Sequence, residues 1–545
     1  MSNLPIFTYQ ARIAAGEGAS SALDAYAALY AKVERSLFAA MQKSGANLNA
    51  LKREFLPRFG ITARQFNAVR IGLEGKIDSI KARRPDLIQE LQARIKAAEK
   101  VIAKLGLRPT QAAKLHQKKR RHAILLSRLA AMQADHKEGL VRLCFGSKRL
   151  FRAQFALSAN GYANHQEWKD AWQSARSDQF FVLGSGDETA GNQSCQASLD
   201  GDGSLSLMLR LPGAMLRDGD SKYLTLSGVR FAYGHQSIVD ALSQSQRIQS
   251  VTKAGKAVVK RIGCALSYRF VRDAKGWRVF VSCEAQDVPL VSSRMAGAIG
   301  VDINADHLAL SEVDRFGNWI NSQRIALSTY GKTSHQAKAL TGDAAVAIAQ
   351  QARAAGKPVV IEKLDFAKKK TGLESTHPRY ARMLSSFVCN KVSSSIKAAC
   401  FRLGVECIEV NPAYTSVIGA VNFAQVKGIS VHMGAATAIA RRGLGLSEQV
   451  PKRVAVVPAR SGGHITFCVP VRNRQKHVWT QWAKVRTSLK AAHVAHFRSG
   501  APKGMPAPLS SVMQALGSIR SSTAQFRGAN RQQHCSVDVL MDVPF

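Results

Sequence analysis

Two acidic residues that each follow a short apolar stretch are the strongest candidates for chemistry in this sequence. Asp302 lies in AIGVDINADHLALSEVD (298–314), where the apolar pattern predicts two strands joined by a turn. Glu362 follows the β-branched run Val359-Val360-Ile361, and DAAVAIAQQARAAGK (343–357) predicts a crossover helix between the two motifs. Carboxylates at the ends of neighbouring buried strands can hold two Mg²⁺ ions about 3.5–4 Å apart. The spacing therefore predicts a metal-dependent site for phosphodiester chemistry.

Each acid taken alone has a simpler interpretation. An Asp at the end of a strand often serves as a turn or cap residue, and Glu362 could form an ordinary ion pair with Lys363. Their combination, in this order and in a strongly basic chain, favours the metal-binding interpretation. Asp365 lies three residues beyond Glu362, so in a continuing strand its side chain would point to the opposite face. No catalytic role is assigned to it.

His432 is the candidate for a third group. It stands in VHMGAATAIARRGLG (431–445), and the stretch 411–447 contains no Asp or Glu. A neutral imidazole can bind a divalent ion or act as general base on an attacking water. Alternatively, a His at the start of a helix is a cap or surface residue. His432 is thus either a working group or the remnant of a site that has lost its acid, and we favour the first interpretation.

The first 140 residues or so must be mainly helical. LPIFTYQARI (4–13) predicts a strand, and apolar residues three and four positions apart then predict successive helices. Ser20 or Ser21 is expected to cap the first of these helices, and Thr62 to open another. The same apolar spacing continues after Pro85, at Leu87, Leu91, Ile95 and Ile102.

From about residue 145 to 290 the apolar period changes to two. The stretch 264–285 predicts a hairpin around a DAKG turn, and GDGSLSLMLRLPG (201–213) predicts another strand. One helix is expected in NHQEWKDAWQSAR (164–176). We expect a β-rich, barrel-like domain here, which makes the whole chain a multidomain α+β protein.

The charge of the chain identifies the class of partner. With 77 Lys and Arg against 37 Asp and Glu, the formal charge is +40, which favours a polyanion, most commonly a nucleic acid. A membrane surface is the rival partner, but no basic amphipathic helix, lipidation motif or membrane-length apolar run is present. The nine cysteines form no CxxC pair, and the N-terminus does not resemble a signal peptide. We therefore expect reduced thiols, no zinc ribbon and a cytoplasmic location.

Several basic residues are candidates for nucleic-acid contacts, although solvated surface positions are the alternative for each. KLHQKKRRH (114–122) is a basic cluster, AKKKTG (367–372) follows the second acidic motif, and two arginines follow the small residues after His432. The last two could hold a phosphate or be exposed cations at a helix end. Trp479 and Trp482 could stack on bases, but burial is the preferred interpretation. The candidate contacts are Lys118, Lys119, Arg120, Arg121, Lys368, Lys369, Lys370, Arg441 and Arg442.

These motifs resemble those of a known nuclease family. GVDINADHLALSEVDRFGN is similar to the first RuvC motif, and VVIEKLDFAKKK to the second, of TnpB nucleases and the type V CRISPR effectors. NPAYTS (411–416), followed by HMGAATAIARRG (432–443), resembles the third motif. The resemblance is specific over 297–445, and upstream it extends only to the architecture: a short strand, a helical recognition lobe and a β-rich wedge domain.

The resemblance implies that Asp302 and Glu362 are the first two metal-binding acids and that His432 occupies the position of the third. Two features depart from the family pattern: the ribbon cysteines are absent, and the third acid is a histidine. RuvC-type sites of type II CRISPR effectors also use a histidine in this region. The implied cofactor is Mg²⁺ or Mn²⁺, with no zinc. The implied C-terminal domain has an RNase H-like (RuvC) α/β fold.

The resemblance also implies a domain plan. The expected parts are a first wedge strand (1–15), a helical recognition lobe (16–144), a β-rich wedge domain (145–296), a RuvC nuclease domain (297–500) and a basic, loosely ordered C-terminal segment (501–545).

Three functions are possible as hypotheses. The first is an RNA-guided DNA endonuclease that binds a guide RNA, recognises a short motif beside the target DNA and cuts at one RuvC site. The second is an RNA-guided DNA-binding protein whose site is defective. The third, a transposase, would need a DNA-binding helix-turn-helix, and none is evident. The sequence leaves open the source of the guide, the strand preference and the oligomeric state.

Overall fold

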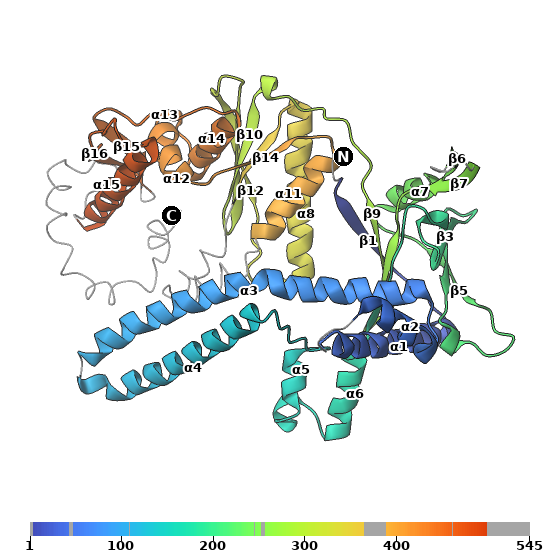
Figure 1. Ribbon diagram of the computed structural model, residues 1–545. Coiled ribbons are helices and arrows are strands. Elements are labelled where there is room, and N and C mark those ends of the chain that lie inside the picture. The colour runs from blue at the N-terminus through green and yellow to red at the C-terminus, as the bar shows by residue number, and fades with distance from the viewer. Residues whose placement is uncertain are drawn as a thin grey trace. The chain divides into compact units, whose positions relative to one another are not determined.

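The computed structural model divides the chain into two compact units, unit 1 (Met1–Asp287) and unit 2 (Val288–Phe545) (Figure 1). The structure describes residues 4–42, 47–107, 109–244, 246–251, 257–363, 389–459 and 462–498. The expected C-terminal segment (501–545) and Lys368, Lys369 and Lys370 lie outside the described residues. No helix in the described residues is long and apolar enough to span a membrane.

Helices dominate the first half of unit 1, as the sequence predicts. The α-helices of unit 1 in the described residues are α1 (Glu17–Met41), α2 (Leu48–Phe59), α3 (Ala63–Gly106), α4 (Ala112–Lys137), α5 (Lys148–Ala153), α6 (His165–Arg176) and α7 (His235–Ser243). Thr62 opens α3 with a capping box shared with Gln65, which confirms that prediction. Helices α3 and α4 form an antiparallel pair joined by a short turn (Figure 1). No residue of α4 is buried, so that helix presents most of its charge to solvent.

The predicted start of the first helix is wrong. Helix α1 begins at Glu17 after Gly16, so Ser20 and Ser21 lie inside the helix rather than capping it. The apolar pattern that continues past Pro85 belongs to α3, which is 44 residues long and contains this proline. A proline inside a helix removes one main-chain hydrogen bond and crowds the carbonyl four residues before it, and packing of α3 along α4 offsets this cost.

The strands of unit 1 form separate small sheets. A four-stranded sheet has the order β1-β9-β8-β2, and the N-terminal strand β1 pairs antiparallel with β9. Strands β3, β4 and β5 form a second sheet, and β6 and β7 a third. The bounds are β1 (Ile6–Arg12), β2 (Gln179–Val182), β3 (Cys195–Leu199), β4 (Leu205–Arg210), β5 (Tyr223–Val229), β6 (Gln246–Val251), β7 (Ala257–Ile262), β8 (Ser267–Asp273) and β9 (Gly276–Glu284).

The barrel-like domain expected from the sequence is wrong, since none of the sheets in the described residues closes on itself. The four-stranded sheet instead packs one face on α1, where Tyr26 stacks on Phe180 at 4.2 Å between ring centroids, and Phe180 stacks on Phe270 at 4.7 Å. These rings bury the apolar face without closure of the sheet.

Unit 2 is built on a five-stranded mixed sheet of order β12-β11-β10-β13-β14. The first three strands are antiparallel, whereas β10, β13 and β14 are parallel. Helices α8 and α11 share an apolar core with the sheet, and α14 packs on β10, β11 and β13. The elements are β10 (Ala298–Ile303), β11 (His307–Val313), β12 (Trp319–Ala326), α8 (Ser334–Ala355), β13 (Val359–Glu362), α11 (Cys389–Arg402), β14 (Cys407–Val410) and α14 (Val431–Gly443).

A further apolar core gathers the remaining elements of unit 2. Trp482 is 1% exposed in this core beside Phe467 and Ile465, which confirms the predicted burial of Trp482. Trp479 is 40% exposed, so the prediction that it is buried is wrong. The elements are α12 (Thr415–Ile418), a π-helical turn η6 (Gly419–Ala424), α13 (Gln425–Lys427), β15 (Val454–Pro458), β16 (His464–Cys468) and α15 (Val478–Arg498).

A buried histidine makes the stability of α15 depend on pH. His493 is 5% exposed, and its Nδ1 has no hydrogen-bond partner within the described part of the chain. Burial, aided by the nearby His496, lowers the pKa of His493 to about 4. The unfolded chain therefore binds a proton below about pH 6.5, whereas the folded chain does so only near pH 4. The free energy of unfolding therefore has its full value above pH 6.5, and it decreases as the pH falls toward 4.

We expect the thermal unfolding midpoint of the wild type to fall more steeply between pH 7 and pH 5 than that of His493→Leu. The difference corresponds to about 2 kcal/mol, because one pH unit is worth about 1.4 kcal/mol for one differential proton. Differential scanning calorimetry across this range measures it. Parallel pH curves for the two proteins would contradict the assignment.

Candidate active site

The two acids lie side by side because β10 and β13 are parallel and in register. Val301 is paired with Ile361, so Asp302 and Glu362 each stand one residue beyond this pair and on the same face of the sheet. Both are 6% exposed. Gly300, two residues before Asp302, faces α14. The buried strands thus present both carboxylates to the side that α14 covers.

Small residues bring α14 unusually close to this face. A Cβ on Gly300 would lie 2.0 Å from the carbonyl oxygen of Ala436, a contact that no side chain permits. The GAATA run that follows His432 therefore serves close packing of a helix on a strand. This packing fixes the start of α14 over the end of β10.

His432 contacts the first acid directly. Its Nδ1 lies 3.2 Å from Oδ2 of Asp302, and its side chain is 16% exposed. The helix cap is Ser430, whose hydroxyl accepts from the backbone N–H of Met433 at 3.2 Å. His432 is therefore not the cap. Because a carboxylate only accepts, Nδ1 is the donor, which leaves Nε2 as the basic nitrogen of the neutral ring.

Polar residues of the turn after β10 complete the surroundings of Asp302. Asn304 Nδ2 donates to Oδ2 of Asp302 at 2.9 Å, and the ring of His307 meets that of His432 edge-on at 5.0 Å between centroids. Nδ1 of His307 lies 2.7 Å from Oδ1 of Asp306. Burial lowers the pKa of His307 despite this carboxylate, and the neighbouring His432 acts in the same direction. No role for these residues is predicted from the sequence, although the polar residues Asn304, Asp306 and His307 all lie within five positions of Asp302.

Glu362 is held from another element. The hydroxyl of Thr415 donates to Oε1 of Glu362, and the same hydroxyl lies 3.1 Å from the carbonyl oxygen of Pro412. Thr415 is fully buried at the start of α12, directly after Tyr414, whose φ is +63°. The left-handed turn at Tyr414 aims the threonine at the acid. Thr415 belongs to the NPAYTS motif (411–416). The sequence predicts no role for any individual residue of this motif.

The two arginines of α14 contact protein groups. Arg442 donates to the backbone carbonyls of Asn411 and Ala413, the latter at 3.0 Å. Burial lowers the pKa of Arg442, and the negative charge of nearby Glu362 opposes that shift. Arg441 donates to Glu448 and, at 2.6 Å, to the carbonyl oxygen of Gly317. Neither arginine is a freely exposed helix-end cation, and phosphate contact by either stays a prediction.

The other basic candidates lie elsewhere. Lys118, Lys119, Arg120 and Arg121 are exposed on α4 in unit 1. They are available to a polyanion, and contact with nucleic acid stays a prediction for them.

The donor atoms suit a hard divalent ion. Asp302 and Glu362 offer carboxylate oxygens, which Mg²⁺ and Mn²⁺ prefer. Among the described residues, no group of three or more His, Cys, Asp or Glu side chains is arranged to hold a metal ion. Mg²⁺ is commonly bound by only one or two carboxylates, with water and substrate phosphates as the other ligands. The residues present therefore fit an ion that is completed by the substrate.

Comparisons with known proteins give distant likenesses. No family model matches the chain, and no curated protein matches it. A solved Cas12f1–sgRNA–target DNA complex is 11% identical, covers 67% of this chain and 95% of its own, and has a TM-score of 0.20. A CRISPR–Cas12f ternary complex is 12% identical, covers 82% of this chain and 99% of its own, and has a TM-score of 0.18. At TM-scores this low the likeness carries no argument, so the function must be inferred from the residues themselves.

Proposed function

We propose that the protein is an RNA-guided DNA endonuclease with one active site, in unit 2. The observation that carries the proposal is the juxtaposition of Asp302 and Glu362 on parallel strands, with His432 hydrogen-bonded to Asp302. The strand order, three antiparallel strands followed by two parallel ones with helices on both sides, supports an RNase H-like domain. The +40 charge supports nucleic-acid partners, which we propose to be a guide RNA and its target DNA in the cytoplasm.

Each residue has a distinct role in the proposed mechanism. Asp302 and Glu362 would hold Mg²⁺ or Mn²⁺, which supplies Lewis-acid polarisation of the scissile phosphodiester when bound. Asp302 also orients His432 by accepting its Nδ1–H, so that Nε2 can take a proton from the attacking water. Thr415 fixes the carboxylate of Glu362, and Arg442 balances charge nearby. Guide pairing would supply sequence specificity, with a short duplex motif beside the target read by the protein.

A guided DNA-binding protein without cleavage is the second candidate. The observation that favours it is the absence of an acid between 411 and 447, which leaves the site with two carboxylates and a histidine. In that case the hydrogen bond between His432 and Asp302 would be purely structural.

Replacement of His432 separates the two candidates. We expect His432→Ala to reduce cleavage about 10²-fold or more, since general-base catalysis contributes that much. The protein is purified after co-expression with its native locus, so that it can retain its RNA. It is then incubated, in buffer with Mg²⁺, with a plasmid library that carries a guide-matched target and randomised flanks. Asp302→Ala is the negative control.

The possible outcomes have distinct meanings. Flank-selective cutting by the wild type that is lost in both variants supports the endonuclease with a catalytic His432. Flank-selective plasmid retention without any cutting would establish the guided binder instead. Cutting that persists undiminished in His432→Ala would contradict the role of His432.

A further inference from the structure

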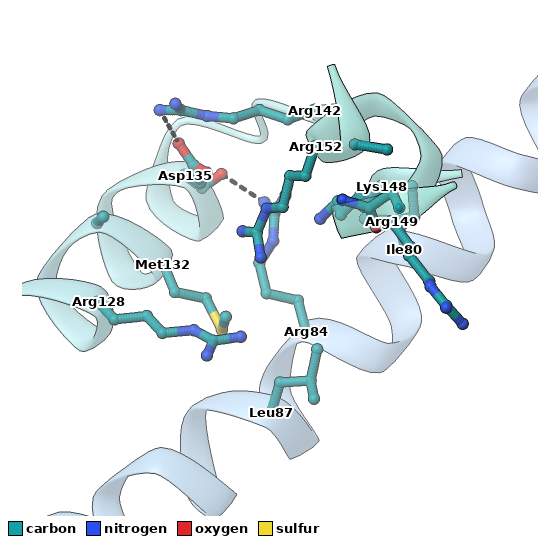
Figure 2. A pocket seen from close by; sticks show the side chains of 13 residues that line it. Ile80, Arg84, Leu87, Arg128, Met132, Asp135, Arg142, Lys148, Arg149 and Arg152 are labelled. Carbon is teal, nitrogen blue, oxygen red and sulfur yellow. Dashed lines mark hydrogen bonds and ion pairs between the residues drawn. The ribbon is translucent and has the colours of Figure 1, made fainter. Parts of the chain in front are cut away.

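A basic pocket in unit 1 is separate from the candidate active site. It lies between α3, α4 and α5, has a volume of about 890 Å³, and Figure 2 shows the side chains around it. Its charged lining consists of six cations and a single acid, Asp135. In Figure 2 the guanidinium groups of Arg84, Arg128 and Arg152 point toward the space between the helices.

The positive charge of the pocket is not neutralised internally. Asp135 is already engaged by Arg142 at 3.0 Å. Arg84 is 6% exposed, and within the described residues it donates to the backbone carbonyls of Asp135 and Leu140, each at 2.6 Å. Within the described part of the chain, no ion pair is formed by the other lining cations. These are Arg128, Lys148, Arg149 and Arg152.

Arginines so arranged select phosphate. The planar guanidinium presents several donors in a fixed fork that matches phosphate oxygens, and Arg84 is held in place by its two carbonyl bonds. Apart from Asn160, the remaining lining is apolar and includes Ile80, Leu87 and Met132. The flat faces of guanidinium groups and an apolar surface both accept a nucleobase.

The dimensions favour a single nucleotide over a duplex. Pockets that enclose small ligands commonly have volumes of about 300–1,000 Å³, and this one lies in that range. A duplex presents its phosphates on a wide surface and keeps its bases stacked inside, so it would leave the apolar lining uncovered. An unpaired nucleotide turned out of its helix can satisfy both parts of the lining.

We propose that this pocket binds an unpaired, everted nucleotide of RNA, with its base on the apolar lining and its flanking phosphates on Arg128, Arg149 and Arg152. The inference rests on the proposed function in one respect: a guide RNA is the partner that carries such unpaired nucleotides. A bulged DNA and a free nucleotide are the competing sources of the same chemistry, and the experiment includes both.

The test compares two RNA hairpins that differ by one bulged 2-aminopurine nucleotide, using the full-length protein and fluorescence anisotropy. We expect the bulged hairpin to bind about tenfold more tightly, a value within the roughly 5- to 150-fold that stacking of one base on a side chain contributes. Its 2-aminopurine emission should change on binding, which reports eversion directly. The double variant Arg128→Ala/Arg152→Ala should reduce the preference to less than twofold.

A matched control lies on the same helix. Lys118→Ala/Arg121→Ala removes the same charge from α4 outside the pocket, and it should weaken both hairpins equally and keep the preference. Met132→Trp fills the pocket without changing charge, and it should abolish the preference while binding of the paired hairpin persists. Because Met132→Trp leaves every arginine in place, it still tests the pocket if Arg128→Ala/Arg152→Ala folds poorly.

Several results would overturn the proposal. These are equal binding of the two hairpins, a preference that survives in the pocket variants, an equal preference for bulged DNA, or full competition by free ATP at micromolar concentration. The pocket and the proposed function can fail separately. Flank-selective plasmid binding without bulge preference would overturn only the pocket, whereas bulge preference without any flank-selective binding would overturn only the guided function.

Discussion

Replacing Asp302 with Asn is expected to reduce target-DNA cleavage by about 10³-fold, and Glu362→Gln to do the same. Both changes keep the size and shape of the side chain and remove only its negative charge. An amide oxygen can still accept from Nδ1 of His432 or from the hydroxyl of Thr415, so the local hydrogen bonds are retained. The substitutions remove the pair of anionic oxygens that a hard divalent ion requires.

Binding should respond differently from cleavage. The two acids are buried at the end of the sheet, so their neutralisation leaves the basic surfaces unchanged. We expect guide-RNA and target-DNA affinities, measured by filter binding, to stay within about twofold of wild type, since loss of a negative charge does not weaken phosphate contacts.

Asp343→Asn is the matched control, because Asp343 is an exposed acid on α8 in the same unit. It should cleave like the wild type. A cleavage activity that survives in both Asp302→Asn and Glu362→Gln would contradict the assignment of the active site. Loss of RNA binding in these variants would indicate a folding defect, which thermal unfolding would detect.

The placement of the acids could be predicted from the sequence because it depends on local patterns. A β-branched run with a terminal acid predicts a buried strand, and a crossover helix between the two acidic motifs implies that the strands carrying the acids are parallel. The sheet confirms this: β10 and β13 are parallel. Thr62 was predictable for a similar reason, since a capping box lies within four consecutive residues.

The contacts that complete the site could not be predicted in this way. Thr415 lies 53 residues from Glu362, and their contact depends on the left-handed backbone of Tyr414, a conformation that no local preference of tyrosine favours. Asn304 and His307 have the polar character of ordinary turn residues until the fold brings α14 over them. The open sheets of unit 1 illustrate the same limit, because closure of a barrel depends on register between distant strands.

Gly300 is the residue whose replacement should disturb both the fold and the site most. Its Cα lies so close to α14 that a methyl group would meet the Ala436 carbonyl oxygen at 2.0 Å and the backbone nitrogen of Ala440 at 2.6 Å. Both are helix main-chain atoms, which cannot rotate away as a side chain does. The helix must move outward, and the cores on either side of it lose contacts.

We therefore expect Gly300→Ala to destabilise unit 2 by about 3 kcal/mol or more, the upper range for overpacking of a core. Calorimetry would detect this as a lower midpoint of thermal unfolding. Gly342→Ala is the matched control: no atom lies within 4 Å of the added methyl group. Since Gly342 lies inside α8, that substitution should be neutral or slightly stabilising, by about 0.5–1 kcal/mol. Equal midpoints for the two variants would contradict the close packing of α14 on β10.

The same variant also probes how His432 acts. Outward movement of α14 lengthens the 3.2 Å contact between His432 and Asp302, while Glu362 keeps its bond from Thr415 on a separate helix. If His432 takes a proton from the attacking water, cleavage by the folded fraction of Gly300→Ala should fall about as far as in His432→Ala, and addition of the second substitution should cost little more. If the two losses multiply in the double variant, the contributions are independent, and the role of α14 would be limited to stability.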